Sequence, residues 1–325
     1  MPEESALAGG VLGMECQDRR PRGRRGHSSM TAFRLKNLQG LVLALAAVWL
    51  TERASAQAPV ETMRAFQRYS AAVQKRTEAE GASPHFLQME ARPDARKRLM
   101  AGEILTIPAS GLKLDPQIDI PGGQVQHWIG AAFVPHASLD RAIAGLQDYG
   151  NRKRYMQPVI IDSRVLSHTG DEFEIYLRLR QKALLSAVFD VVQRIQYIRQ
   201  GRSRLLIESK SESVREVPSE QSPRGTPARD RGLIWALDDY WRLAEGDGGV
   251  YIECEALVLS RQVPVVIRWF AGGMIARASE RMLAGTLKAD VRIIGDAQRG
   301  AAPQAERERG RNSGSVALLV STQSP

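Results

Sequence analysis

Residues 249–260 read Gly-Val-Tyr-Ile-Glu-Cys-Glu-Ala-Leu-Val-Leu-Ser, and this stretch with its two flanks decides the fold. Its side chains fall into two alternating sets: Val250, Ile252, Cys254, Ala256 and Val258 in one, Tyr251, Glu253, Glu255, Leu257 and Leu259 in the other. Strict alternation of this length is typical of a β-strand with one buried face. The two glutamates predict that their face of the strand meets water near its start.

The flanks of this strand predict a hairpin before it and a long helix after it. Residues 233–245 are rich in large side chains that strands favour, and Gly246-Asp247-Gly248-Gly249 supplies the positive φ angles of a tight hairpin turn. After Pro264 the apolar residues recur every three or four positions, which predicts an amphipathic helix of up to about 28 residues. Beyond Ile294 the composition turns to Ala, Gln, Arg, Gly and Ser, so we expect 295–325 to be a disordered tail.

The N-terminal region has the pattern of an export signal. A positively charged start from Met30 precedes the apolar run 41–50, and Ala54-Ser55-Ala56 forms a small-residue cleavage site. We therefore expect a signal peptide from Met30 to Ala56, a mature chain that begins near Gln57, and a periplasmic or secreted protein. Residues 1–29 are then an upstream extension from a start codon assigned in error. An uncleaved membrane anchor and a twin-arginine signal are the alternatives.

Hydrophobic periodicity divides the mature chain into a leading helical segment and one domain. Residues 57–100 form a helical segment or linker, with a helix over 58–80, and the domain covers 101–294. Ser138 is a suitable N-cap for a helix, and a second short helix is expected over 152–156. The domain's other expected elements are strands at 102–108, 124–134, 159–168, 172–180, 183–199 and 202–214.

Composition argues against several classes of function. The net charge of +9 over 325 residues is mild, and no basic run with interleaved aromatic residues suggests nucleic-acid binding. Of the two cysteines, Cys16 lies ahead of the mature start, so no internal disulfide is expected, and Cys254 is interpreted as a small buried apolar residue. The spacing of the histidines predicts neither a metal site nor a cofactor.

The order of expected elements resembles that of a known superfamily. A strand, two short helices, about six antiparallel strands and a long C-terminal helix are similar to the helix-grip fold of the START, Bet v 1 and polyketide-cyclase (SRPBCC) proteins. The likeness extends over about 124–294 and includes Trp241-Arg-Leu and the strand after Gly248-Gly249. It implies an α+β fold in which a curved antiparallel β-sheet wraps around the long C-terminal helix. It also implies an apolar ligand, such as a lipid, held between sheet and helix.

A cavity of this kind needs apolar walls with a few polar points. The residues expected to form it are Trp235, Leu237, Trp241, His127 and Asp239 from the strands, with Trp269, Phe270 and Met274 from the helix. Three functions remain open: a carrier for a lipid or another apolar molecule, with peripheral contact to a membrane; a cyclase or aromatase using Asp239, His127 or Tyr240; and an envelope protein-interaction module whose cavity is filled by side chains.

The one close carboxylate pair, Asp238-Asp239, also allows two interpretations. Adjacent strand residues face opposite sides, so only one of the two can line a cavity. A buried Asp beside aromatic residues can have a raised pKa and act as an acid or base. An exposed Asp paired with an arginine is the alternative. For His127, the alternative to ligand binding is a structural histidine whose hydrogen bonds are satisfied within the protein.

Overall fold

The structure is a computed structural model that describes residues 58–318, except 82, 84, 110–117, 183–185, 228–230 and 232. For residues 182, 265–271 and 300–318 it describes the backbone alone. By its internal contacts the chain divides into Met1–Glu52 and Arg53–Pro325, and all described residues lie in the second unit. The predicted upstream extension and signal peptide therefore lie outside the described residues.

The strands that the structure describes form a single antiparallel eight-stranded sheet in the order β1-β2-β8-β7-β6-β5-β4-β3. After the first two strands, each strand pairs with the next along the chain, and β8 then returns to pair with β2. The bounds are β1 Leu105–Pro108, β2 Gly123–Pro135, β3 Ile160–Thr169, β4 Glu172–Lys182, β5 Ser186–Arg199, β6 Arg204–Val217, β7 Ala236–Gly246 and β8 Gly249–Arg261.

The hairpin that joins β7 and β8 has the turn that its sequence predicted. Gly246 pairs with Gly249, so Asp247 and Gly248 alone make the turn. Their φ angles are 52° and 75°, and two consecutive positive φ angles define the type I′ turn whose twist matches that of the flanking strands. The predicted hairpin is confirmed, and it fixes the register of every pair between the two strands.

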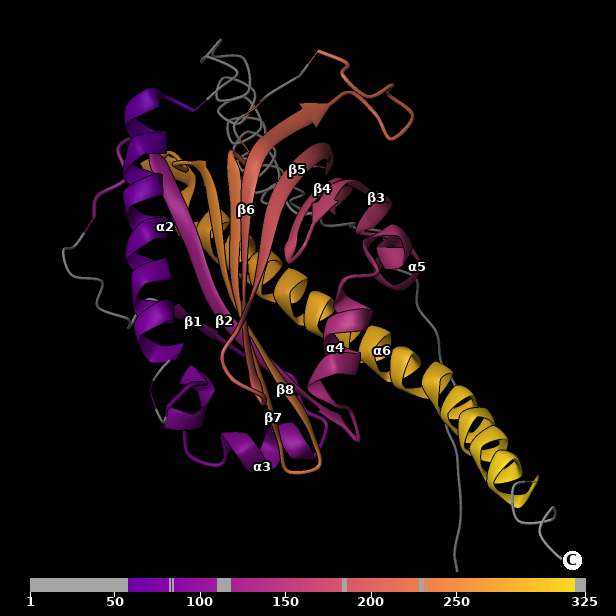
Figure 1. Cartoon of the computed structure of the whole chain (residues 1–325). Coiled ribbons are helices and arrows are strands. Elements are labelled where there is room, and N and C mark those ends of the chain that lie inside the picture. Colours follow the sequence, from indigo (N-terminus) through magenta and orange to yellow (C-terminus); the bar gives the residue numbers. More distant parts are fainter. Residues whose placement is uncertain are drawn as a thin grey trace, which may run out of the picture. The chain divides into compact units, whose positions relative to one another are not determined.

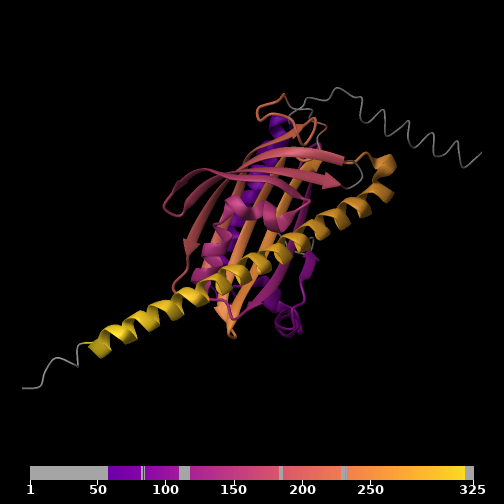
Figure 2. The ribbon, with the colours of Figure 1, turned by 90° about the vertical axis from the view of Figure 1, so that its right-hand side faces the viewer.

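Helix α6 (Val265–Leu318) crosses the inner face of the curved sheet, where it packs against β2 and against the short helix α4 (Leu139–Leu146) (Figures 1 and 2). The close approach to β2 depends on Gly130, because a Cβ atom there would lie 2.7 Å from Leu287 and 3.0 Å from Leu283 of α6. The resemblance to START, Bet v 1 and polyketide-cyclase proteins implied this α+β helix-grip arrangement, and the structure confirms it.

The elements between β2 and β3 also follow the sequence. Ser138 caps α4 by accepting a hydrogen bond from the backbone N–H of Arg141 at 3.4 Å. The short helices η3 (Tyr149–Asn151) and α5 (Arg152–Met156) follow, and α5 has the bounds expected for it. Both α4 and α5 contact α6, so these helices lie on the same side of the sheet as α6.

Helix α6 is longer than predicted. Its 54 residues continue past Ile294 into 295–318, which the sequence analysis assigned to a disordered tail. Residues 296–309 are rich in Ala, Gln, Glu and Arg, which have high helix propensity and also resemble disordered sequence in composition. Composition alone therefore does not separate a solvated helix from a disordered segment here.

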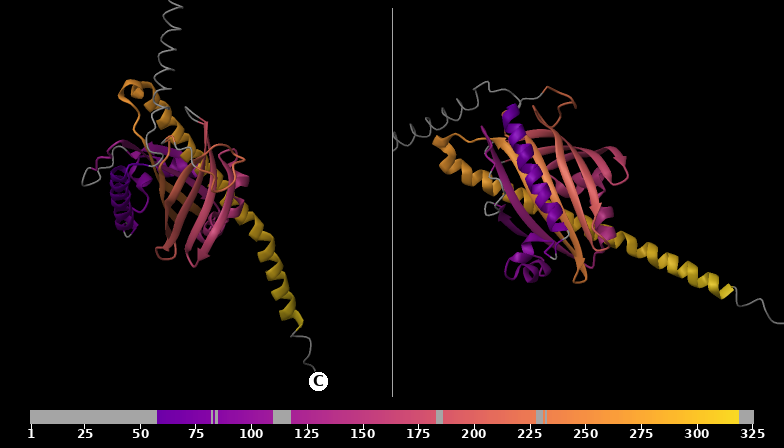
Figure 3. Two further views of the ribbon diagram at one scale, coloured as in Figure 1. Left: turned by 90° about the horizontal axis from the view of Figure 1, so that it is seen from above. Right: turned by 60° about the vertical axis from the view of Figure 1, so that its left-hand side comes forward.

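The segment before β1 covers the outer face of the sheet. Helix α2 (Val60–Gly81) runs along this face, on the opposite side of the sheet from α6 (Figure 3), and η1 (Gln88–Ala91) and α3 (Ala95–Met100) follow it. The buried side of α2 carries Phe66 and Val73, which pack in a cluster with Leu257 and Leu259 of β8. The curved sheet is thus covered by helices on both faces.

Candidate functional site: a cavity between the sheet and helix α6

A cavity of about 160 Å³ lies between the inner face of the sheet and helix α6. Strands β2 and β4–β8 supply most of its wall, and η3, α5 and α6 close it. This volume measures the space open to the centre of a water-sized sphere, on which scale one water needs about 10–15 Å³. The cavity is therefore much larger than a single buried water requires.

The wall is mainly apolar with a few polar side chains. Apolar contributors include Trp128, Ile175, Leu177, Ile195, Ile207, Val258 and Met282. Polar contributors include Gln126, Tyr149, Arg152, Gln193, Tyr197, Ser209 and Asp239. Cys254 also lines the cavity and is only 1% exposed, so the predicted buried position of this free thiol is confirmed.

Three of the residues expected in the cavity line it together. Leu237, Asp239 and Trp241 alternate along β7, and the outward-facing Asp238 and Tyr240 lie between them. The two members of the carboxylate pair therefore face opposite sides of the sheet, as strand geometry predicts. The alternative of an exposed Asp is wrong for Asp238, which is only 6% exposed, and Asp239 faces the cavity.

His127 and Trp235 do not line the cavity, and the expectation that they would is wrong. His127 lies on the outer face of β2, between the cavity residues Gln126 and Trp128. Trp235 precedes β7, where the alternation is interrupted: Trp235 and Ala236 both pack in the outer cluster with Phe66. Counting inward positions back from Leu237 therefore fails at Trp235, the residue just before the strand.

The helix residues proposed from sequence are placed less favourably. Met274 is 45% exposed and is absent from the cavity wall. Trp269 and Phe270 lie in the first turns of α6, but their side chains are outside the described residues. Within the described side chains of α6, the wall is formed by Ser279, Met282, Leu283 and Thr286.

Asp239 is the acidic side chain of the cavity wall. Ser209 is its direct partner on β6, and Ala256 is its partner on β8. Burial raises the pKa of Asp239 to about 7, and the negative charge of Asp238 contributes in the same direction. The positive charge of Arg152 and a hydrogen bond from Gln193 oppose this shift. At neutral pH the carboxyl group is therefore close to the midpoint of its titration, where it can both accept and release a proton.

A second group of polar side chains reaches the cavity from the helices. Arg152 of α5 forms an ion pair of 2.8 Å with Asp290 of α6, which is fully buried. The guanidinium group also lies over the ring of Tyr149, 5.4 Å from its centre. The hydroxyl groups of Tyr149 and Tyr197 are hydrogen bonded at 2.6 Å. Burial raises the pKa of Tyr149 to about 12 and holds that of Tyr197 well above its usual value, so both stay neutral near pH 7.

The sequence analysis missed these helix-side residues because no local pattern marks them. Arg152 sits in the run Arg-Lys-Arg, where charged residues normally face solvent. One signal was available on the strands: Gln193 occurs between Val191 and Ile195 on the apolar face of β5. A polar residue on an otherwise apolar strand face indicates either a structural hydrogen bond or a polar point in a cavity.

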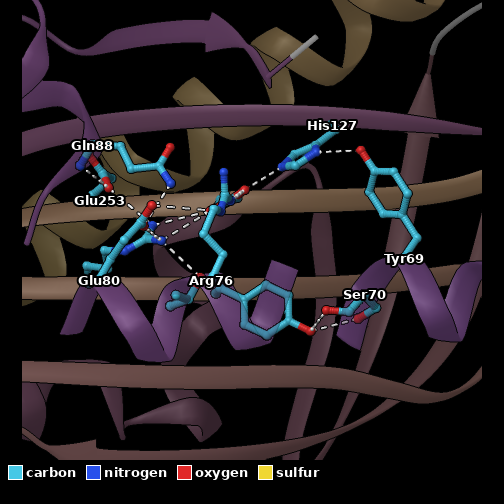
Figure 4. A network of polar contacts seen from close by, with 11 residues as sticks. Tyr69, Ser70, Arg76, Glu80, Gln88, His127 and Glu253 are labelled. Carbon is cyan, nitrogen blue, oxygen red and sulfur yellow. Dashed lines mark hydrogen bonds and ion pairs between the residues drawn. The ribbon is translucent and has the colours of Figure 1, made fainter. Parts of the chain in front are cut away.

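The outer face of the sheet carries a separate polar network beneath α2 (Figure 4). Glu253 and Glu255 of β8 are both fully buried, so the prediction that their face meets water is wrong. Arg242 of β7 lies 3.3 Å from each of these carboxylates and 2.8 Å from Glu80 of α2. Arg76 of α2 pairs with Glu255 as well.

The same network explains His127. Its Nε2 atom lies 2.6 Å from Glu255, and its Nδ1 atom lies 2.8 Å from the hydroxyl of Tyr69 on α2 (Figure 4). Both ring nitrogens thus have partners, which confirms the interpretation of a satisfied structural histidine. Nearby, Ser70 of α2 donates a hydrogen bond of 2.6 Å to Asp238. These residues attach α2 to β2, β7 and β8, and they do not line the cavity.

No group of three or more His, Cys, Asp or Glu side chains among the described residues is arranged to hold a metal ion. No helix in this part of the chain is long and apolar enough to cross a membrane.

No protein-family model and no curated protein matches this sequence. Several solved structures are similar. The STAR-related lipid transfer protein of Xanthomonas axonopodis has 19% identity over 55% of this chain and 96% of its own, with a TM-score of 0.39. The Zhui aromatase/cyclase of Streptomyces sp. R1128 has 15% identity over 54% of this chain and 95% of its own, with a TM-score of 0.39. Human STARD10 has 12% identity over 60% of this chain and 76% of its own, with a TM-score of 0.38. At these identities the likeness concerns the arrangement of helices and strands alone.

Proposed function

We propose that this protein holds a lipid or another apolar small molecule in the cavity between the sheet and α6, and that it carries this ligand in the periplasm or outside the cell. The observation that carries the proposal is the cavity itself, with about 160 Å³ of space and a mainly apolar wall. Folded proteins rarely keep apolar space of this size, because the side chains around an empty space lose their packing contacts. A ligand restores those contacts.

Several features of the described residues support a carrier. The wall is built from many strands and from α6, so a ligand is enclosed rather than laid on a surface. The few polar side chains suit a role in orientation and specificity. The open cavity also favours a ligand-holding protein over an interaction module, for which we expected large side chains to fill this space. Contact with a membrane surface during ligand exchange belongs to the same proposal.

The first experiment is native mass spectrometry of the exported protein, followed by organic extraction of whatever it has bound. We expect an added mass that the extraction releases and that proves to be apolar. The purified protein should also take up a neutral apolar dye such as N-phenyl-1-naphthylamine. A protein of unmodified mass that also fails to bind the dye would refute the carrier proposal.

The rate of chemical modification of Cys254 is an independent measure of whether the cavity is occupied. Because its thiol lines the wall, a bound ligand should protect it from a small neutral thiol reagent. Peptide mass spectrometry separates its modification from that of Cys16, the other cysteine of the chain. We expect the dye or the extracted ligand to slow modification at Cys254 in proportion to occupancy. If saturating dye leaves the rate of Cys254 modification unchanged, the dye binds outside this cavity.

Export is tested on the precursor that begins at Met30. Expression from Met30, followed by cell fractionation and N-terminal sequencing, should give a product in the periplasm or the medium that begins near Gln57. An uncleaved product found in the cytoplasm would contradict export, but it would not contradict the proposal that the protein holds a ligand.

A cyclase or aromatase-type enzyme is the second candidate, and Asp239 is the observation that favours it. A carboxyl group with a pKa of about 7 in an apolar cavity can serve as a general acid or base. The extracted ligand decides between the two candidates, because an enzyme would convert it and a carrier would release it unchanged. If turnover occurs, Asp239→Asn should abolish turnover and retain binding.

A further inference from the structure

Part of the cavity wall is polar, and it surrounds Arg152, whose charge acts on Asp239, Tyr149 and Tyr197. On the sheet, Ser209 and Asp239 are direct partners across β6 and β7, and Gln193 of β5 lies close enough to Asp239 to lower its pKa. From the other elements come Arg152 and the hydrogen-bonded pair Tyr149–Tyr197. We call these six residues the polar end: Tyr149, Arg152, Gln193, Tyr197, Ser209 and Asp239, all of which line the cavity.

The tyrosine pair leaves one hydrogen-bond donor unused. The hydroxyls of Tyr149 and Tyr197 carry two protons, and their bond of 2.6 Å uses one. Among the described residues neither hydroxyl has another partner, so the second proton has no acceptor there. These side chains are 3% and 4% exposed. A buried donor without an acceptor is costly, which makes this proton a point of attachment for a ligand oxygen.

The sheet side of the polar end offers acceptors. The carboxyl group of Asp239 has two oxygens, and Gln193 satisfies at most part of their capacity. The hydroxyl of Ser209 has no hydrogen-bond partner among the described residues, although this side chain is only 4% exposed. The ligand group that fits must therefore accept a hydrogen bond and donate one.

The charges at the polar end argue against an ionic ligand group. The positive charge of Arg152 is already paired with Asp290, which is fully buried, so it is poorly available to a carboxylate or phosphate. Asp239 adds further repulsion for an anion whenever it is ionised. An ammonium group would in turn lose its hydration shell in exchange for a carboxyl group that is near its titration midpoint at neutral pH. A neutral group avoids both costs.

We propose that the ligand carries a hydroxyl group and binds with this group at the polar end, where it accepts a hydrogen bond from the Tyr149–Tyr197 pair and donates one to Asp239. This inference rests on the proposed function and specifies its ligand class: a neutral apolar alcohol. It assigns to Asp239 and the tyrosine pair the role of recognising the polar end of the ligand.

The test compares four probes on the full chain by displacement of the neutral dye: decanol, decyl methyl ether, decylamine and decanoic acid. The ether accepts a hydrogen bond without donating one, so we expect decanol to displace the dye about tenfold more effectively than the ether. Decanoic acid and decylamine should both be weaker than decanol. Equal displacement by decanol and the ether, or stronger displacement by either ionic probe, overturns the inference.

Two substitutions at Asp239 refine the result. Asp239→Asn keeps an acceptor and removes the charge, so decanol binding should stay within about threefold, and Asp239→Leu should remove the preference for decanol over the ether. Asp238→Asn is the matched control, because the neighbouring carboxylate faces α2 on the outer side of the sheet. A loss of the decanol preference in Asp238→Asn equal to that in Asp239→Leu would contradict the assignment.

Substitutions in the tyrosine pair should change the affinity for decanol in a pattern that a merely structural role would not produce. In Tyr149→Phe or Tyr197→Phe the remaining hydroxyl loses its partner, and its proton becomes free to bond to the ligand. Each single variant should therefore bind decanol almost as well as the unmodified chain, and the double variant should lose about tenfold. Additive losses would overturn this part of the inference. If the dye and all four probes fail to bind the unmodified chain, the proposed function falls as well, whereas binding without a decanol preference removes this inference alone.

Discussion

Replacing Asp239 by Asn should stabilise the protein, and the gain should depend on pH in a defined direction. The folded-state pKa of Asp239 is raised from 3.8 to about 7, chiefly by burial. Between these two values the unfolded chain has lost the proton and the folded chain retains it. The folded state then binds more protons, so stability falls as pH rises. Below about pH 4 both states are protonated and Asp239 has no such cost.

The shift sets the size of the effect. A difference of about three pKa units at 1.36 kcal/mol each gives a destabilisation of up to about 4 kcal/mol above pH 7. Water in the cavity reduces this cost, so the figure is an upper bound. Asparagine has nearly the same shape and cannot ionise. The gain from Asp239→Asn should therefore be small near pH 4 and should grow to a few kcal/mol near pH 8.

The assay is urea unfolding of both proteins across this pH range, followed by fluorescence of the tryptophans. The difference between the two unfolding free energies removes contributions that do not depend on Asp239. A matched control is Asp140→Asn, since the side chain of Asp140 is 79% exposed and its substitution should change stability by less than about 1 kcal/mol throughout. A difference between Asp239→Asn and the unmodified protein that is constant with pH would refute the reasoning.

Three further predictions concern the sheet and its two covers. Arg242→Met should lower the unfolding free energy by about 3–5 kcal/mol, because it leaves buried carboxylates without their cation. Arg194→Met, at a side chain that is 58% exposed, should lower it by less than about 1 kcal/mol. Urea unfolding of both variants measures the difference. Burial raises the pKa of Glu255, but the neighbouring histidine and arginines outweigh this effect and lower the pKa to about 2. Glu255 therefore contributes stability above about pH 4.5, and this contribution is lost as the pH falls toward 2. In acid unfolding, Glu255→Gln should flatten the dependence of stability on pH in this range. Gly130→Ala should destabilise the protein by about 1–3 kcal/mol in thermal or urea unfolding because its Cβ would overlap leucines of α6, whereas Gly150→Ala, which meets nothing within 4 Å, should not.

The fold could be predicted from sequence because its signals are local. The alternation along β8, the two-residue turn at Asp247-Gly248 and the change of period after Pro264 each depend on neighbouring residues alone. Their order along the chain then limits the arrangement to a sheet that packs on one long helix. These signals also placed Leu237, Asp239 and Trp241 on one face of one strand.

The rest of the site could not be predicted because it depends on contacts between distant segments. Glu253 and Glu255 look like solvent-facing residues in sequence, and they are covered by η1 and α2, which lie more than 150 residues earlier. His127 takes its role from the same cover. Arg152 lies at the cavity wall, where it is paired with Asp290 of α6. No pattern within β8 or α5 contains that information.

The adjacent residues Asp238 and Asp239 connect the two faces of the sheet. Asp238 accepts hydrogen bonds from Ser70 of α2 and from the backbone N–H of Ser211, which fix β7 against its cover and its neighbouring strand. Asp239 is held at the polar end of the cavity by the same stretch of backbone, and the charge of Asp238 contributes to its raised pKa. The outer cover therefore has a consequence on the inner face, because it fixes the stretch of backbone from which Asp239 points into the cavity.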